Sequence, residues 1–121
     1  MISSRKIEDL RPEVQALAKA FVAKAKEEGI DVLIYCTLRD FECQAELYAQ
    51  GRTKPGRIVT NARPGDSWHN YGVAWDCVPL INGKAAWDDD NAYAKLGRIG
   101  EALGLEWAGR WSGKRKEKAH F

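Results

Sequence analysis

The stretch Ser67-Trp68-His69-Asn70-Tyr71-Gly72-Val73-Ala74-Trp75-Asp76 holds one of only two histidines in the chain, seven residues before an aspartate. The other histidine, His120, stands near the end of the sequence in Glu117-Lys118-Ala119-His120. Two histidines and an aspartate suit a zinc ion that keeps its fourth position open to water. Glu117 is an acid that can take a proton from such a water. The two segments together predict a metal-dependent hydrolase.

The residues around this motif suggest how it folds. Val73 to Leu80 is expected to be a strand, with Asp76 in its middle between apolar neighbours. An ionised carboxylate there is costly unless it is paired or binds a metal. Gly72 lets the backbone turn sharply enough to bring the His69 ring back towards Asp76. An aspartate bonded to the backbone or to an arginine is the alternative that the local sequence leaves open.

The rest of the chain alternates helix and strand signals. A stripe of apolar residues between Pro12 and Gly29 predicts an amphipathic helix. Asp40 is expected to cap a second helix running to about Gln50, and a third helix follows the acids at 88–90 and ends at Gly104. Strands are expected at 31–36, 73–80, 84–87, 105–107 and 119–121, with a hairpin at 82–83 and a long exposed loop at 51–65.

This order of elements predicts the α+β class. We expect a small single domain over residues 1–121, in which an antiparallel sheet packs against about three helices and carries the zinc site. A length of 121 residues gives room for one core. We expect no separate cell-wall-binding domain within these 121 residues.

Composition excludes several classes of protein. An apolar fraction of 45% argues against disorder, and a net charge of +2 gives no reason to expect nucleic-acid binding. No stretch approaches the ~18 apolar residues of a membrane span, and no signal peptide is visible. Three cysteines without a CxxC pair are interpreted as reduced thiols rather than a zinc finger. The basic segment 110–118 is either a solvated end or a rim that attracts an acidic polymer.

The pattern Ser67-x-His69-x-x-Gly72-x-Ala74-x-Asp76, followed far downstream by acid-x-x-His, resembles the signature of the zinc D-alanyl-D-alanine carboxypeptidase and dipeptidase superfamily. The chain is more similar to its L-alanyl-D-glutamate endopeptidases, the cell-wall lysins of phages and prophages. The resemblance runs from about residue 30 to the end. The further segments that carry it are Thr37-Leu38-Arg39, the run from Gln44 to Thr53, the run from Pro64 to Gly72, and Gly104-Leu105-Glu106-Trp107.

The resemblance implies a role for particular residues. A zinc ion would be held by His69, Asp76 and His120, with Glu117 as the general base. Arg39 would steady the developing oxyanion or a substrate carboxylate, although a plain surface arginine is the alternative. The expected substrate contacts are Ser67, Tyr71, Gln44 and Trp68, with simple loop hydrogen bonding as the alternative for Ser67 and Tyr71.

Two departures from the lysin pattern stand out. Ala108-Gly109-Arg110-Trp111 replaces the usual Gly-Gly-Asp-Trp, so a base stands where an acid is expected. Arg110 is therefore expected to weaken a hydrogen bond behind a metal ligand. Ala119 replaces the usual proline before the final histidine, and Glu117 stands where many relatives have aspartate.

The expected function is hydrolysis of the peptidoglycan stem peptide at the L-Ala–D-Glu bond by a phage or prophage endolysin. A D-alanyl-D-alanine carboxypeptidase and a non-catalytic module that binds metal or cell wall remain as alternatives. The protein is expected to be a monomer that binds no nucleic acid and inserts in no membrane. We expect it to stay in the cytoplasm of the bacterial host until a phage holin releases it to the wall.

Overall fold

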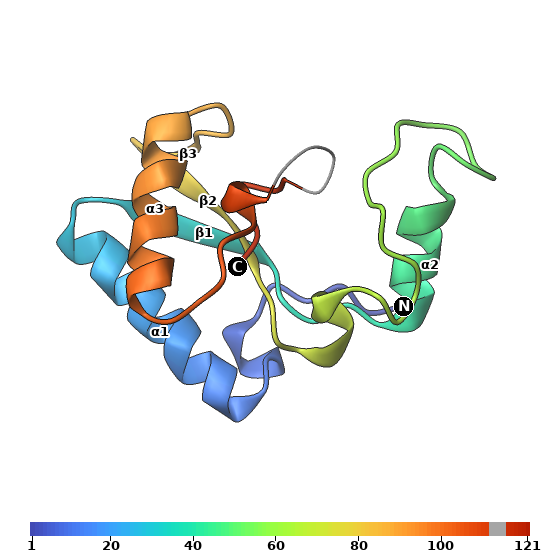
Figure 1. The fold of residues 1–121 in the computed structure, drawn as a ribbon, viewed down its shortest axis with the longest axis horizontal. Coiled ribbons are helices and arrows are strands. Elements are labelled where there is room, and N and C mark those ends of the chain that lie inside the picture. Colours follow the sequence, from blue (N-terminus) through green and yellow to red (C-terminus); the bar gives the residue numbers. More distant parts are fainter. Residues whose placement is uncertain (112–115) are drawn as a thin grey trace.

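The computed structural model describes residues 1–111 and 116–121. Three helices and three strands follow one another along the chain (Figure 1). Short 3₁₀ turns lie at Ile7–Asp9, Trp68–Tyr71 and Ala108–Arg110. The helices and strands are α1 (Pro12–Glu27), β1 (Asp31–Cys36), α2 (Phe41–Ala49), β2 (Asp76–Ile81), β3 (Lys84–Ala85) and α3 (Asp90–Ala102).

The sheet is antiparallel throughout, with β2 between β1 and β3. Asn82 and Gly83 connect β2 to β3 with positive φ angles of 53° and 77°. Two consecutive positive φ angles are typical of the tight hairpin turn that Asn-Gly predicts. The pairing of β1 with β2 shifts between Ile34 and Cys36, so that Cys36 lies opposite Asp76 at the end of the ladder.

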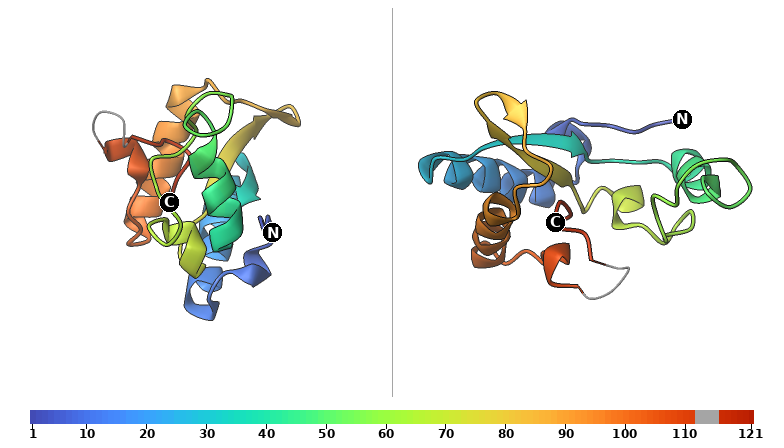
Figure 2. Two further views of the ribbon diagram at one scale, coloured as in Figure 1. Left: turned by 90° about the vertical axis from the view of Figure 1, so that its right-hand side faces the viewer. Right: turned by 90° about the horizontal axis from the view of Figure 1, so that it is seen from above.

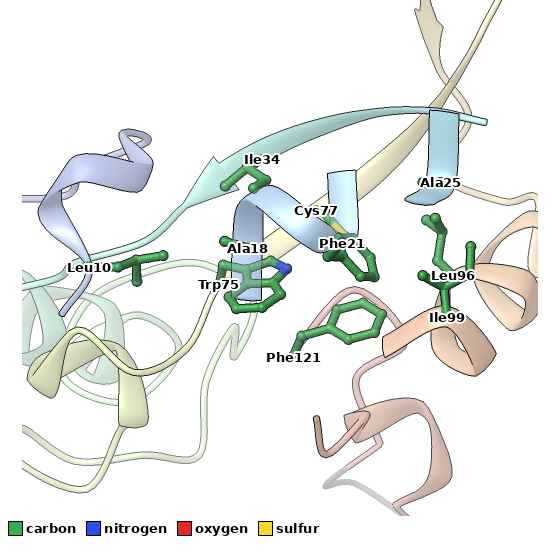
Figure 3. Close-up of a cluster of buried hydrophobic side chains, with 10 residues drawn as sticks. All are labelled: Leu10, Ala18, Phe21, Ala25, Ile34, Trp75, Cys77, Leu96, Ile99 and Phe121. Atoms are coloured by element: carbon green, nitrogen blue, oxygen red, sulfur yellow. The ribbon is translucent and has the colours of Figure 1, made fainter. Parts of the chain in front are cut away.

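Helices α1 and α3 lie against the same side of the sheet (Figure 2). Their apolar faces and the sheet enclose one core, in which the rings of Phe21, Trp75 and Phe121 pack together. Figure 3 shows these rings between the helices and the strands. The buried cluster comprises Leu10, Ala18, Phe21, Ala25, Ile34, Trp75, Cys77, Leu96, Ile99 and Phe121.

Helix α2 and the loop after it extend away from this core (Figure 1). No member of the apolar cluster comes from residues 35–74. Hydrogen bonds hold this region instead: the Asp40 carboxylate accepts from the backbone N–H groups of Cys43 and Ile2, each at 2.8 Å. Burying polar groups requires such partners, so this part of the molecule depends on specific hydrogen bonds more than on apolar burial.

The C-terminal segment returns to the sheet beside β2. Phe121 and Trp75 exchange two backbone hydrogen bonds of 2.9 and 3.1 Å, and Asp76 forms an isolated bridge with His120. The Trp107 ring anchors the same segment, because its Nε1 donates to the Lys118 carbonyl at 2.8 Å.

Two glycines make room for the Trp107 ring. A Cβ atom on Gly97 of α3 would lie 2.3 Å from that ring, and one on Gly109 would lie 2.2 Å from it. Only a residue without a side chain permits such an approach. The ring therefore ties the C-terminal segment closely to α3.

The structure confirms the expected class, with three helices and an antiparallel three-stranded sheet. The expected α1, α2 and α3 are present, and residues 51–65 contain no helix or strand. Four strand predictions need correction, and one of them is that β3 ends at Ala85 rather than at residue 87. β2 begins at Asp76 rather than at Val73, because the preceding residues pair only through Trp75. Residues 105–107 are not a strand, since they turn to place the Trp107 ring against α3, and 119–121 form only a single bridge. None of the described helices is long and apolar enough to cross a membrane.

Candidate metal centre

His69 stands in the 3₁₀ turn Trp68–Tyr71, which fixes the direction of its ring. The Ser67 hydroxyl caps the turn by accepting from the His69 N–H, and Gly72 ends it with a φ of 68°. The His69 ring is buried, and its Nδ1 lies 2.8 Å from the Thr37 carbonyl. The carbonyl can only accept, so Nδ1 carries the proton and donates it. In the neutral ring this puts the lone pair on Nε2, on the side of Asp76, which is the state that a metal ligand requires.

Asp76 and His120 come together where β2 meets the C-terminal segment. The Asp76 Oδ1 atom lies 3.0 Å from His120 Nδ1 and 3.2 Å from His69 Nε2. His69 Nε2 is buried but forms no well-aligned hydrogen bond. One carboxylate oxygen thus lies between two imidazole nitrogens from segments far apart in the sequence.

The electrostatics of this group favour a positive charge at its centre. Burial opposes ionisation of Asp76, but the neighbouring His120 and His69 imidazoles hold the pKa of this carboxyl well below its usual range. Burial likewise opposes a charge on His69, but Asp76 and Cys36 raise the pKa of its imidazole. A proton or a metal cation can supply that positive charge. The donor set of two imidazoles and one carboxylate, together with the unpartnered His69 Nε2, fits Zn²⁺.

Glu117 enters the same group from the turn before His120. Oxygen and nitrogen atoms of Asp76, Glu117 and His120 all lie within 4.8 Å of one another. The side chain of Glu117 is about half exposed, and its Oε2 lies 3.9 Å from His120 Nδ1. Backbone hydrogen bonds from Glu117 to Ala108 and from His120 to Glu117 hold the turn in place. The acid therefore lies beside Asp76 and His120 while remaining open to solvent.

Arg39 follows β1 and approaches the cleft from the opposite side. Its two terminal nitrogens donate to the Gln44 Oε1 atom at 2.9 Å and to the Cys36 Sγ atom at 3.2 Å. Gln44 is fully buried, and its Nε2 donates to the Ala62 carbonyl at 2.8 Å. Gln44 therefore ties the guanidinium to residues 60–62, which form one wall of the cleft.

These side chains surround one open cleft of ≈ 420 Å³. The cleft contains every predicted metal ligand and both predicted catalytic residues. Of the predicted substrate contacts, Gln44 lies behind Arg39 and does not line the cleft. Tyr71 also lies outside the lining, with its hydroxyl donating to the Gly65 carbonyl at 2.6 Å. The lining comprises Arg39, Leu47, Val59, Thr60, Asn61, Ala62, Asp66, Ser67, Trp68, His69, Asp76, Trp111, Glu117 and His120.

Sequence reasoning gave no site role to Cys36. Its Sγ lies 3.7 Å from His69 Nδ1, and its sulfur, His69 and Asp76 form a second group of possible ligands. Burial opposes the change, but His69 and Arg39 lower the pKa of the Cys36 thiol. The sequence did hold a signal for this site role, because Cys36 ends a predicted strand and stands three residues before Arg39. The Thr37 carbonyl was beyond sequence reasoning, because backbone contacts depend on the fold.

Arg110 makes a different contact from the one expected of it. Its guanidinium donates to both carboxylate oxygens of Glu101 on α3, at 2.6 and 2.9 Å. None of its described hydrogen bonds reaches His69, Asp76 or His120. Within the basic segment 110–118, Lys114 and Arg115 lie outside the described residues, and Lys118 pairs with Asp90.

The fold and the convergent His69, Asp76 and His120 define a small α+β protein with a candidate metal centre in an open cleft. A family model described as VanY, D-alanyl-D-alanine carboxypeptidase, matches residues 7–119. The chain belongs to this family.

Two individual relatives of this chain are L-alanyl-D-glutamate peptidases. The chain is 46% identical over 112 residues to the peptidoglycan L-alanyl-D-glutamate endopeptidase CwlK of Bacillus subtilis, covering 85% of this chain and 67% of that protein. It is 32% identical to an L-alanyl-D-glutamate peptidase of a Listeria phage, covering 88% of this chain but only 36% of the phage protein. These two relatives show that the resemblance to the endopeptidase branch is sound.

Solved structures agree on the fold. The L-Ala D-Glu endopeptidase ChiX of Serratia marcescens aligns with a TM-score of 0.70 over 99% of this chain and 86% of its own, at 21% identity. The D,D-pentapeptidase VanY from a vancomycin-resistance cassette, solved in complex with Zn(II), aligns with a TM-score of 0.54 at 18% identity, over 92% of this chain and 70% of its own.

Proposed function

We propose that this protein is a zinc-dependent peptidase that hydrolyses the peptidoglycan stem peptide at the L-Ala–D-Glu bond. One observation carries the proposal: His69 and His120 both approach the Asp76 carboxylate in an open cleft, with the Glu117 carboxylate beside His120. The names of the Bacillus and Listeria phage relatives support this choice of bond.

The metal would be held by His69 Nε2, the Asp76 carboxylate and His120 Nδ1. A bound zinc ion supplies a Lewis acid for the scissile carbonyl and lowers the pKa of a water ligand to about 7. The Thr37 carbonyl keeps a proton on His69 Nδ1, so Nε2 is the nitrogen left to bind a metal. Asp76 adds one negative charge, which offsets part of the charge of a divalent cation.

Glu117 would act as the proton carrier. Its carboxylate lies close enough to the ligand group to accept a proton from the attacking water and to pass it to the leaving amine. Arg39 would place a permanent positive charge near the carbonyl oxygen as negative charge develops there. Cys36 and Gln44 hold two of its nitrogens, so little reorganisation is required during the reaction.

A D-alanyl-D-alanine carboxypeptidase is the second candidate, because the family model carries that description. Both reactions use the same metal group and differ in which residues of the stem peptide enter the cleft. A non-catalytic module that binds metal or cell wall would keep the ligands without turnover.

The biological setting is also a proposal. Similarity to a phage peptidase supports a role as a phage or prophage endolysin, which would remain in the host cytoplasm and reach the wall with help from a holin. We propose that the protein acts on peptidoglycan as a monomer, without a nucleic-acid partner.

The decisive test is mass spectrometry of purified peptidoglycan after incubation with zinc-loaded protein, beside an EDTA-treated sample. New L-Ala carboxyl and D-Glu amino termini that require metal would establish the endopeptidase. Release of D-Ala would identify the carboxypeptidase instead. Bound zinc without new termini would favour the binding module.

The variant Glu117→Ala examines the proposed base. It should bind one zinc ion, because Glu117 is not among the three ligands, while kcat falls by about 10²–10⁴-fold. Glu8→Ala is the matched control, since it removes an exposed carboxylate that is not part of the cleft lining. Full activity of the Glu117 variant would show that another group carries the proton.

A further inference from the structure

Three exposed aromatic side chains lie in or against the 3₁₀ turn that carries His69. Trp68 is 59% exposed, Phe41 is 52% exposed and Tyr71 is 48% exposed. Trp68 lines the cleft and directly precedes the candidate ligand His69. Large aromatic side chains left in water next to a cleft are typical of binding surfaces.

The 3₁₀ turn and one ring contact link Trp68, which lines the cleft, to Tyr71 and Phe41, which do not. Trp68 and Tyr71 are the first and last residues of the 3₁₀ turn, and side chains three apart in a 3₁₀ turn lie on the same side. The Tyr71 ring meets the edge of Phe41 with its centroid 6.2 Å away. We call Trp68, Tyr71 and Phe41 the aromatic strip.

Hydrogen bonds at the base of the strip limit its motion. The Tyr71 hydroxyl donates to the Gly65 carbonyl at 2.6 Å, and the Gly65 N–H donates to Asn70 Oδ1 at 3.0 Å. Asn70 Nδ2 in turn donates to the Arg39 carbonyl at 2.8 Å. A preorganised surface of this kind loses less entropy when a ligand covers it.

The chemistry of the proposed substrate places a sugar near this surface. In peptidoglycan the amino group of L-Ala is amide-bonded to the lactyl group of N-acetylmuramic acid. The sugar therefore lies only one residue and one lactyl unit from the scissile carbonyl, a span of at most ~7 Å. A protein that cuts the L-Ala–D-Glu bond must accommodate the glycan at the edge of its cleft.

Trp111, which also lines the cleft, is less suited to contact a sugar. Its Nε1 donates to Glu106 at 3.0 Å, and its ring packs on His120 with centroids 5.7 Å apart. The rings of the aromatic strip, in contrast, are each about half exposed, and only Trp68 is part of the cleft lining.

We propose that the aromatic strip is a binding subsite for the glycan strand of peptidoglycan. The apolar C–H faces of the sugar rings stack on Trp68, Tyr71 and Phe41, while their hydroxyls stay in water. This inference rests on the proposed function, because it assumes cleavage next to the sugar.

The first experiment compares two substrates that differ only in the sugar. One is the N-acetylglucosaminyl-N-acetylmuramyl tripeptide, and the other is the same tripeptide capped by a lactyl group. The native protein should show a kcat/KM at least tenfold higher for the disaccharide substrate. Phe41→Ala should reduce this ratio by about 3–10-fold, which corresponds to the loss of one aromatic contact.

Trp87→Ala is the matched control, because Trp87 is 51% exposed but packs beside Tyr35, outside the cleft lining. It should leave the ratio unaltered. Equal kcat/KM values for the two substrates in the native protein would overturn the inference. So would a ratio that Phe41→Ala and Trp68→Ala leave unchanged.

A second experiment does not depend on turnover. Chitotetraose is titrated into metal-free, ¹⁵N-labelled protein, and the indole N–H signals are followed by NMR. The Trp68 signal should shift in a saturable way while the Trp87 signal stays in place. If neither substrate is cleaved but Trp68 shifts, the proposed function fails and the glycan subsite stands. If cleavage occurs and Trp68 does not shift, the function stands and the glycan subsite fails.

Discussion

The two parts of this molecule are held together by different forces. The sheet with α1 and α3 is built around apolar side chains, including the stacked rings of Trp75 and Phe121. The region 35–74 contributes nothing to that cluster and is held by Asp40, Gln44 and Asn70 through hydrogen bonds to backbone groups.

The candidate metal centre lies where these two parts meet. Asp76 and His120 belong to the apolar part, whereas His69 belongs to the hydrogen-bonded part. Apolar packing is strong but non-directional, whereas hydrogen bonds fix direction at a smaller net energy. The apolar part therefore supplies most of the stability, and the other part sets the direction of His69 and Arg39.

The largest contrast is expected for the same residue type in the two parts. Trp75 is fully buried and Trp68 is 59% exposed. Trp75→Ala should lower the free energy of unfolding by about 3–5 kcal/mol, and Trp68→Ala should change it by no more than about 0.5 kcal/mol. Urea denaturation of both variants provides the measurement. Similar losses of unfolding free energy for the two variants would contradict the division into an apolar part and a hydrogen-bonded part.

A second contrast separates stability from activity. Gln44→Ala removes the link between Arg39 and the Ala62 carbonyl, and kcat should fall about 10–100-fold because the guanidinium loses its position. Gln44→Glu keeps an acceptor for Arg39 and should recover part of that loss. The measurement is kcat and KM on the stem peptide.

Gln15 is the matched control for Gln44. Its side-chain amide likewise donates to backbone carbonyls, those of Glu8 and Leu10, but Gln15 contacts neither Arg39 nor the cleft lining. Gln15→Ala should cost about 0.5–1.5 kcal/mol of stability and leave kcat unaltered. A comparable loss of kcat would mean that Gln44 acts through stability alone.

The smallest contrast concerns two helix caps of the same chemistry. Asp40 caps α2 and Asp89 caps α3, each by accepting from a backbone N–H. Replacement by Ala should cost about 1 kcal/mol in either case. Amide hydrogen exchange should speed up only in α2 for Asp40→Ala, and across α1, α3 and the sheet for Asp89→Ala. Identical exchange patterns would mean that the two parts unfold as one.

Lowering the pH should have the same effect as Asp40→Ala, because protonation of Asp40 weakens its hydrogen bonds as the cap of α2. Backbone hydrogen bonds from Cys43 and Ile2 lower the pKa of Asp40. The contribution of this cap is therefore present above the unfolded pKa of ~3.9 and is lost as the pH falls through the lower folded value.

Residues with a local physical signal predicted most of the fold. Pro12, Gly29, Asp40 and Gly104 mark helix ends through backbone geometry that needs no tertiary contact, and Asn82-Gly83 specifies its turn in the same way. The ligand set His69, Asp76 and His120 was predicted from residue chemistry, and the structure brings the three together. Their roles stay a prediction.

What sequence reasoning missed depends on contacts between distant segments. Leu105-Glu106-Trp107 has the composition of a strand, but the tertiary contact of Trp107 with α3 overrides that propensity. The contact between Cys36 and His69 joins residues 33 positions apart. Gln44 was expected to contact substrate, and its burial behind Arg39 became visible only once the loop had been placed.

The close approach around Trp107 also restricts how this sequence can change over time. A side chain at Gly97 or Gly109 would collide with the ring, so either glycine can be replaced only after position 107 holds something smaller. A smaller residue there leaves the Lys118 carbonyl without its indole donor, in the turn that carries Glu117 and His120. Each single step is therefore harmful, although a combined replacement could be tolerated. These three positions should vary as a set among descendants of this sequence.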